Sequence, residues 1–62
     1  MTQVIFIFEI FDEEAGLVVD RFVTFDEARG VDLAFAKCEA LDQDREWNWR
    51  VLQVPFVAEF DD

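Results

Sequence analysis

Carboxylates are the side chains of this sequence with the most chemistry to offer, and they outnumber the basic side chains three to one. Fifteen Asp and Glu residues stand against five Lys and Arg, which gives a formal charge of -10 in 62 residues. A net charge of this size promotes solubility but destabilises the compact state through self-repulsion. Designed small domains do well with a net charge magnitude of about 2–8, so the excess predicts a surface that binds something basic.

The residue types predict no catalytic centre. The sequence has no His and no Tyr, and its one cysteine, Cys38, falls on the expected apolar face of a helix. A nucleophilic cysteine needs a base and an electropositive, partly exposed setting, whereas a free cysteine is often buried in the core. We therefore expect a protein that is not an enzyme and needs no cofactor.

The spacing of the acidic residues does not predict a metal site either. Asp42, Asp44 and Glu46 match the first three ligand positions of a calcium-binding loop. That loop needs glycine at its sixth position and a bidentate Glu at its twelfth. This chain has Trp47 and Gln53 there, so the match fails where it would be diagnostic.

The carboxylates of the expected helix lack basic partners at helical spacing. Neither Asp32 nor Glu39 has a basic residue four positions later, so the usual i,i+4 ion pairs are missing. Seven residues separate the two, which is nearly two turns, and this predicts a column on one flank. A solvated face of any acidic protein would also carry carboxylates, but such faces usually intersperse both signs.

Strands and one helix must position these side chains. Residues 4–11 are β-branched or aromatic on both faces, which predicts a central strand. An acidic hairpin loop ends at Gly16, and residues 17–23 return as a second strand. Residues 24–27 fit a capping box in which the Thr24 hydroxyl accepts from the Glu27 amide, so we expect a helix over residues 25–41.

The helix should place one apolar face on the sheet. Its expected members are Ala28, Val31, Ala34, Phe35, Cys38 and Leu41. Gly30 costs about 1 kcal/mol relative to Ala in a helix interior, and the sequence offers no reason for it.

Residues 47–57 alternate as a third strand, and Pro55 predicts that this strand lies at an edge or ends there. The order β-β-α-β predicts one α+β domain over residues 1–62. Its sheet would be three-stranded and antiparallel, in the order 2-1-3, with a right-handed crossover and one helix packed on one face.

The aromatic residues predict a second surface. One helix leaves the far face of the sheet without cover, and the chain has eight Phe and two Trp to place. We expect an exposed patch there formed by Trp47, Trp49 and some of Phe6, Phe8, Phe22 and Phe25. Because exposed apolar patches usually mark an interface, the alternative is a small protein-binding module or a homodimer whose acidity serves only solubility. An acidic coat of a halophilic protein is a further alternative, which eight Phe fit poorly.

Carboxylates in a row can imitate a nucleic-acid backbone. B-DNA carries one charge per about 1.7 Å of axis, and the hairpin tip, the helix flank and the helix-to-strand connection could present several at comparable spacing. The candidate residues are Asp12, Glu13, Glu14, Asp32, Glu39, Asp42, Asp44 and Glu46. Since like charges repel, the expected partner is a basic DNA-binding protein and not nucleic acid itself.

The size, acidity and β-β-α-β layout resemble those of small phage-encoded inhibitors, particularly the acidic anti-CRISPR proteins that act as DNA mimics on type I Cascade complexes. The resemblance covers the layout of the whole chain and rests on no diagnostic motif. It implies an inhibitor of the type I-C complex, whose large subunit reads the protospacer-adjacent motif. It further implies that the same carboxylates stand in for phosphates and block target recognition.

The expected location is the cytoplasm of a bacterial host. No stretch reaches the roughly 18 apolar residues of a membrane span, and the N-terminus lacks the basic region of a signal peptide. The lone cysteine excludes an internal disulfide framework, which fits a reducing compartment.

Overall fold

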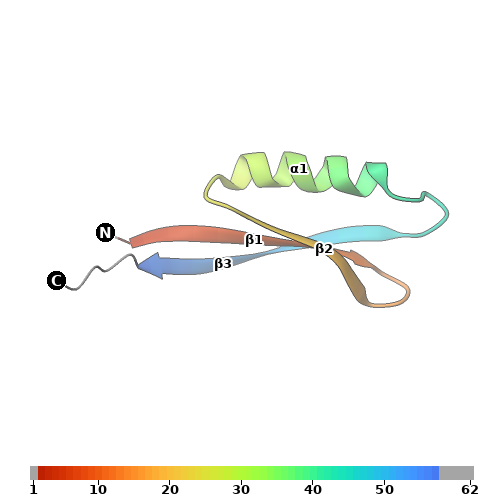
Figure 1. Ribbon diagram of the computed structural model, residues 1–62, viewed down its shortest axis with the longest axis horizontal. Coiled ribbons are helices and arrows are strands. Elements are labelled where there is room, and N and C mark those ends of the chain that lie inside the picture. The colour runs from red at the N-terminus through yellow and green to blue at the C-terminus, as the bar shows by residue number, and fades with distance from the viewer. Residues whose placement is uncertain (1, 58–62) are drawn as a thin grey trace.

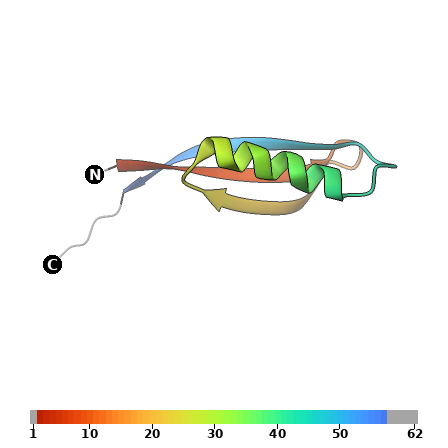
Figure 2. The ribbon, with the colours of Figure 1, turned by 90° about the horizontal axis from the view of Figure 1, so that it is seen from above.

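Three strands and one helix form the predicted α+β fold in the computed structural model, which describes residues 2–57 and the side chains of residues 3–55. The strands β1 (Thr2–Asp12), β2 (Leu17–Thr24) and β3 (Trp47–Val57) make one antiparallel sheet in the order β2-β1-β3. The helix α1 (Glu27–Ala40) lies over one broad face of this sheet (Figures 1 and 2). Within the described residues no helix is long and apolar enough to cross a membrane.

Strand β1 lies in the centre because it carries apolar side chains on both faces. Phe8 stands opposite Phe22 of β2 and Val51 of β3, and all three side chains point toward α1. Phe8 and Ile10 are completely buried. The ring of Phe8 stacks on Phe22 with centroids 5.0 Å apart and lies 5.7 Å from Trp49, so aromatic contacts across all three strands make the core.

The helix meets the sheet through its smallest residues, which explains the glycine inside it. Gly30 and Ala34 are the buried residues of α1. A Cβ built on Gly30 would lie 2.5 Å from Cζ of Phe8 and 2.9 Å from Cγ2 of Thr24. The Phe8 ring therefore occupies the space that any larger side chain at position 30 would need. The helix tolerates the unfavourable propensity of glycine because it lets this ring pack against the helix backbone.

This close approach rotates the helix relative to the predicted phase. Val31, Cys38 and Leu41 pack against the core as expected, but Phe35 is 55% exposed and Ala28 is exposed. The prediction that Ala28 belongs to the packed face is wrong, and Phe35 keeps only an edge-on contact with Trp49 of β3. The face centres on Gly30, because the bulk of Phe8 requires the thinnest part of the helix above it.

The helix begins two residues later than predicted, at Glu27. Thr24 is the last residue of β2 and pairs with Phe6, so its hydroxyl accepts from the Asp26 amide at 3.1 Å. Asp26 is the N-cap, and its carboxylate accepts from the Arg29 amide at 3.2 Å. The predicted capping box from Thr24 to Glu27 is therefore wrong, because Asp26 and not Thr24 directly precedes the first residue of α1.

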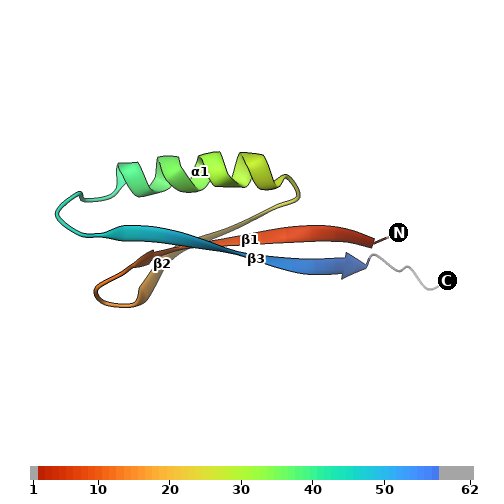
Figure 3. The same cartoon turned by 180° about the vertical axis from the view of Figure 1, so that it is seen from behind.

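Both ends of the sheet depart from a regular three-stranded ladder. Between Ile10 and Phe11 the register with β2 shifts, because Ile10 pairs with Asp20 and Phe11 pairs with Val18. At the other end, Thr2–Ile5 pairs only with β3, so β1 and β3 run on together as a two-stranded ribbon (Figure 3). Pro55 lies in this ribbon on the edge strand β3, as its missing donor predicts.

Candidate acidic interface

Within the described residues, three carboxylates form ion pairs with four of the five basic side chains, and Glu9 is the first of them. It lies in the middle of the uncovered face, directly opposite Arg21 and Arg50 on the two neighbouring strands. Nε of Arg50 donates to Glu9 Oε1 at 2.7 Å, and Nε of Arg21 donates to Oε2 at 3.0 Å. The hydrogen bonds from Arg50 and then Arg21 lower the pKa of Glu9 below its ordinary value of 4.5. Glu9 is 6% exposed, so this pairing offsets the cost of burying a charge.

Asp12 serves the hairpin, which corrects its assignment to the exposed acidic set. Its Oδ1 accepts from the amides of Glu14 at 3.0 Å and Ala15 at 3.3 Å, and Nε of Arg45 lies 3.3 Å from Oδ2. The side chain is 2% exposed. A carboxylate buried by the turn that it stabilises cannot present its charge to a partner. Gly16, at φ +70°, completes this turn.

Asp20 is the third paired carboxylate and links the helix to the sheet. Nζ of Lys37 donates to Asp20 Oδ2 at 2.9 Å and lies 5.7 Å from the centroid of the Phe22 ring. The hydrogen bond from Lys37, with a smaller contribution from the Arg21 amide, lowers the pKa of Asp20 below its ordinary value of 3.8. Both side chains are partly exposed, so we assign this pair a modest share of the stability.

The remaining carboxylates of the described residues form no ion pair. Twelve Asp and Glu residues lie within residues 2–57, and all but the three above are exposed and without a basic side chain within 4.0 Å. These nine unpaired carboxylates are Glu13, Glu14, Asp26, Glu27, Asp32, Glu39, Asp42, Asp44 and Glu46. Among the described residues, Arg29 is the one basic side chain outside an ion pair. Seven of the eight predicted partner-binding residues belong to this set.

The β1–β2 hairpin and the connection between α1 and β3 lie side by side at one end of the sheet. The Glu13 amide donates to the Glu46 carbonyl at 3.0 Å, which joins the hairpin tip to residues 42–46. In that connection, Asp42 Oδ1 accepts from the Asp44 amide at 3.1 Å. The side-chain amide of Gln43 donates to three backbone carbonyls near the helix end, including that of Leu41 at 2.7 Å. These hydrogen bonds hold the backbone of residues 42–46 in place beside the hairpin.

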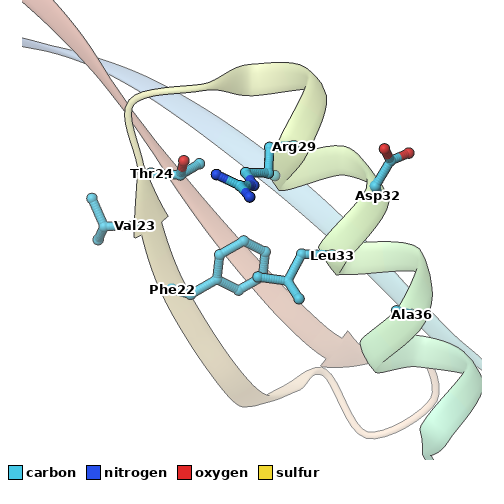
Figure 4. Close-up of a pocket in the computed structure, with 8 residues that line it drawn as sticks. Phe22, Val23, Thr24, Arg29, Asp32, Leu33 and Ala36 are labelled. Carbon is cyan, nitrogen blue, oxygen red and sulfur yellow. The ribbon is translucent and has the colours of Figure 1, made fainter.

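The helix supplies the second part of the acidic surface. Asp32 and Glu39 are both exposed, and Figure 4 shows Asp32 pointing away from the sheet. The structure therefore brings Glu13 and Glu14 close to residues 42–46, and it places Asp32 and Glu39 on the outer side of α1. Within the described residues, no group of three or more His, Cys, Asp or Glu side chains is arranged to hold a metal ion.

The two tryptophans lie on the opposite face from the one predicted. Trp47 stands opposite Asp12 and Trp49 opposite Ile10 in the register of β3 with β1, so both point toward α1 and are half-buried. Trp47 Nε1 donates to the Asp42 carbonyl at 2.6 Å, and Trp49 meets the Phe35 ring edge-on at 5.7 Å. The prediction that they form an apolar patch on the uncovered face is wrong. Strand parity decides this, because every residue that pairs with the buried side of β1 shares its face.

Sequence reasoning also missed an open groove between α1 and the edge strand β2. It has a volume of about 560 Å³ and is lined by Phe22, Val23, Thr24, Arg29, Gly30, Asp32, Leu33 and Ala36 (Figure 4).

Cys38 faces the core side of the helix, where burial raises the pKa of its thiol. A detectable signal for the Glu9 cluster was present in the sequence: one carboxylate in an otherwise apolar strand needs a buried partner.

Comparison with known proteins does not assign this chain to a family. No protein-family model matches this chain, and neither the curated proteins nor the solved structures contain a significant match.

Proposed function

We propose that this chain is a non-catalytic inhibitor that binds a basic DNA-binding surface on another protein and keeps DNA away from it. One observation carries the proposal: in residues 2–57, four of the five basic side chains pair with Glu9, Asp12 and Asp20, while nine carboxylates remain exposed without ion pairs. A surface that needed acidity only for solubility would not require this separation of paired from unpaired charges.

The spacing of the helix carboxylates supports the same proposal. Asp32 and Glu39 are separated by about 10 Å along the helix axis, at 1.5 Å per residue. Phosphates follow one another every 3.4 Å of axis along each DNA strand, so about three steps span the same distance. A groove built to contact phosphates at intervals can therefore contact both carboxylates. Charge complementarity then accelerates association and favours this partner over neutral surfaces.

The resemblance to acidic anti-CRISPR proteins suggests a specific target. We propose the large subunit of a type I-C Cascade, which reads the protospacer-adjacent motif, with inhibition taking place in the cytoplasm of the bacterial host. The partner-binding set is Glu13, Glu14, Asp32, Glu39, Asp42, Asp44 and Glu46, without the buried Asp12.

The test is a competition between this protein and a duplex carrying the motif for purified Cascade. We expect the D32N/E39Q variant to bind about tenfold more weakly, since it removes two exposed charge contacts. The matched control is Q3K/Q53K, which raises the net charge by the same two units at exposed positions of β1 and β3 and should bind within about twofold of wild type.

A Cascade that binds duplex and protein together, with no effect of one on the other, contradicts the proposal. Equal losses in the two variants contradict it as well, because net charge and not the acidic surface would then govern binding. Capture from a bacterial lysate at low salt extends the test to other basic proteins, with displacement by added duplex as the criterion.

A further inference from the structure

The uncovered face of the sheet carries a contiguous patch of aliphatic side chains. The register places Ile7 between Val23 and Leu52, and it places Ile5 opposite Val54. We call these five residues the aliphatic patch. Val23 is 58% exposed, Leu52 52% and Val54 37%. Single exposed aliphatic residues are common, but a group of five on one sheet face is the kind of surface that binds another protein.

This face differs from the rest of the protein in its charge. Among the described residues, its ionisable groups are Glu9, Arg21 and Arg50, together with Glu13, whose Oε1 accepts from Asn48 Nδ2 at 3.1 Å at the hairpin end. Two positive and two negative groups sum to zero, in a chain whose formal charge is -10. Of the other unpaired carboxylates, Glu14 lies in the hairpin turn, and the remaining seven lie on the helix, its N-cap and the connection that follows it.

The core beneath the helix is small for a chain so rich in apolar residues. Hydrophobic residues make up 53% of the sequence, yet the completely buried ones in the described part are Phe8, Ile10 and Ala34. Domains of about 60 residues are already marginal because they bury a small fraction of their surface. A second layer on the uncovered face would bury additional apolar area.

We infer that the occupant of this face is a second copy of the same chain, packed sheet against sheet. A face-to-face pair would be a four-layer arrangement with the helices outside and the aliphatic patches stacked about 10 Å apart. A standard interface takes about 800 Å² from each partner, which is about one sixth of the 4849 Å² surface of the chain. One broad face of a 52 × 21 × 14 Å slab can supply this area.

Charge selects a second copy over other occupants. A partner that brought acidic side chains to this face would be repelled by the -10 body. A basic partner is drawn to the unpaired carboxylates and not to a neutral face. Two copies joined by their neutral faces keep the acidic helices on opposite outer sides. Two sheets then separate these helices by more than the Debye length of about 8–10 Å. This inference goes beyond the proposed function, because the acidic surface, apart from Glu13 at the hairpin end, remains free in the dimer.

Sedimentation equilibrium of the purified full chain tests this inference. We expect a particle of twice the 7.3 kDa chain mass and a melting temperature that rises with protein concentration, because only the folded state associates. Raising the salt concentration should tighten the dimer, since it screens the repulsion between two chains of charge -10. Binding to a basic partner should instead weaken in salt, so the failure of one proposal is distinguishable from the failure of the other.

Two leucine variants locate the interface. Leu52→Lys places an unpaired charge in the aliphatic patch and should raise the dimer dissociation constant about tenfold or more. Leu33→Lys, on α1 at 44% exposure, is the matched control and should leave it unchanged. A wild-type chain that stays monomeric with a concentration-independent melting temperature overturns the inference. A dimer that Leu33→Lys dissociates and Leu52→Lys does not also overturns it.

Discussion

The two faces of the central strand show how one sequence segment produces two different surfaces. The side chains of β1 that point toward α1 are Phe6, Phe8, Ile10 and Asp12, and those that point away are Ile5, Ile7, Glu9 and Phe11. Both sets are mostly apolar, so composition does not separate them. The covered face becomes the core because α1 lies over it, and the uncovered face is organised by one buried carboxylate between two arginines. Burial here depends on the neighbouring element more than on the residue type.

The sharpest test of this contrast makes the same substitution on the two faces of one strand. Phe8→Ala should lower the free energy of unfolding by about 3–5 kcal/mol, because it empties the centre of the core. Phe11→Ala should lower it by about 1 kcal/mol, since that ring is half-buried and contacts the Arg50 guanidinium at 5.3 Å. Urea denaturation monitored by tryptophan fluorescence, at one low protein concentration, measures both. Similar losses at the two positions would contradict the contrast.

A second substitution tests the contact that rotates the helix. Gly30→Ala should destabilise the protein by about 1–3 kcal/mol through overpacking against Phe8, although the same change at an exposed helix position would stabilise it by about 1 kcal/mol. Combining Gly30→Ala with Phe8→Leu should cost less than the sum of the two single changes, because the smaller side chain makes room. Thermal melts of all three variants give this coupling. Additive losses would show that the helix backbone and the Phe8 ring do not compete for space.

The smallest expected effect concerns the uncovered face and appears in the pH dependence. The arginines lower the pKa of Glu9 in the folded state, so the folded state binds fewer protons than the unfolded state near and below pH 4.5. The stability from Glu9 is therefore present above this range and is lost as the pH falls through it. The melting temperatures of Glu9→Gln and wild type should converge between about pH 5 and about pH 3.

The unpaired carboxylates repel one another equally in both proteins, so the difference isolates Glu9. Glu39→Gln, exposed and without an ion pair, serves as the control. The gap in melting temperature between Glu39→Gln and wild type should depend less on pH than the gap between Glu9→Gln and wild type. A constant gap between Glu9→Gln and wild type across the range would show that the arginine contacts do not depend on the ionised carboxylate.

Local patterns in the sequence were sufficient for the secondary structure and the strand order. The apolar run through residues 4–11 predicts the central strand, since the middle of a sheet is where the most apolar strand is best shielded from water. The alternation in residues 47–57 and Pro55 predict the edge strand β3. These predictions hold because backbone hydrogen bonding and side-chain alternation act over a few residues.

The positions of individual side chains could not be predicted in the same way. Phe35 fits the helical apolar pattern, but the Phe8 ring occupies the space beneath Gly30 and turns Phe35 toward Trp49. Trp47 and Trp49 were assigned to the wrong face because the parity of β3 depends on its register with β1, which pairs residues far apart in the chain. Packing between distant segments decides such positions.

The charged residues show most clearly what the sequence determines and what the tertiary structure determines. The sequence by itself determined that this protein is strongly acidic and that few cations are available to neutralise it. Only the tertiary structure decided which carboxylates these cations serve, because Glu9, Asp12 and Asp20 obtain their partners across strands, from the connection and from the helix. Ion pairing requires contact within a few ångströms. The partners of Glu9, Asp12 and Asp20 lie 12 to 41 positions away in the sequence, so only the sheet and the helix above it bring them into contact.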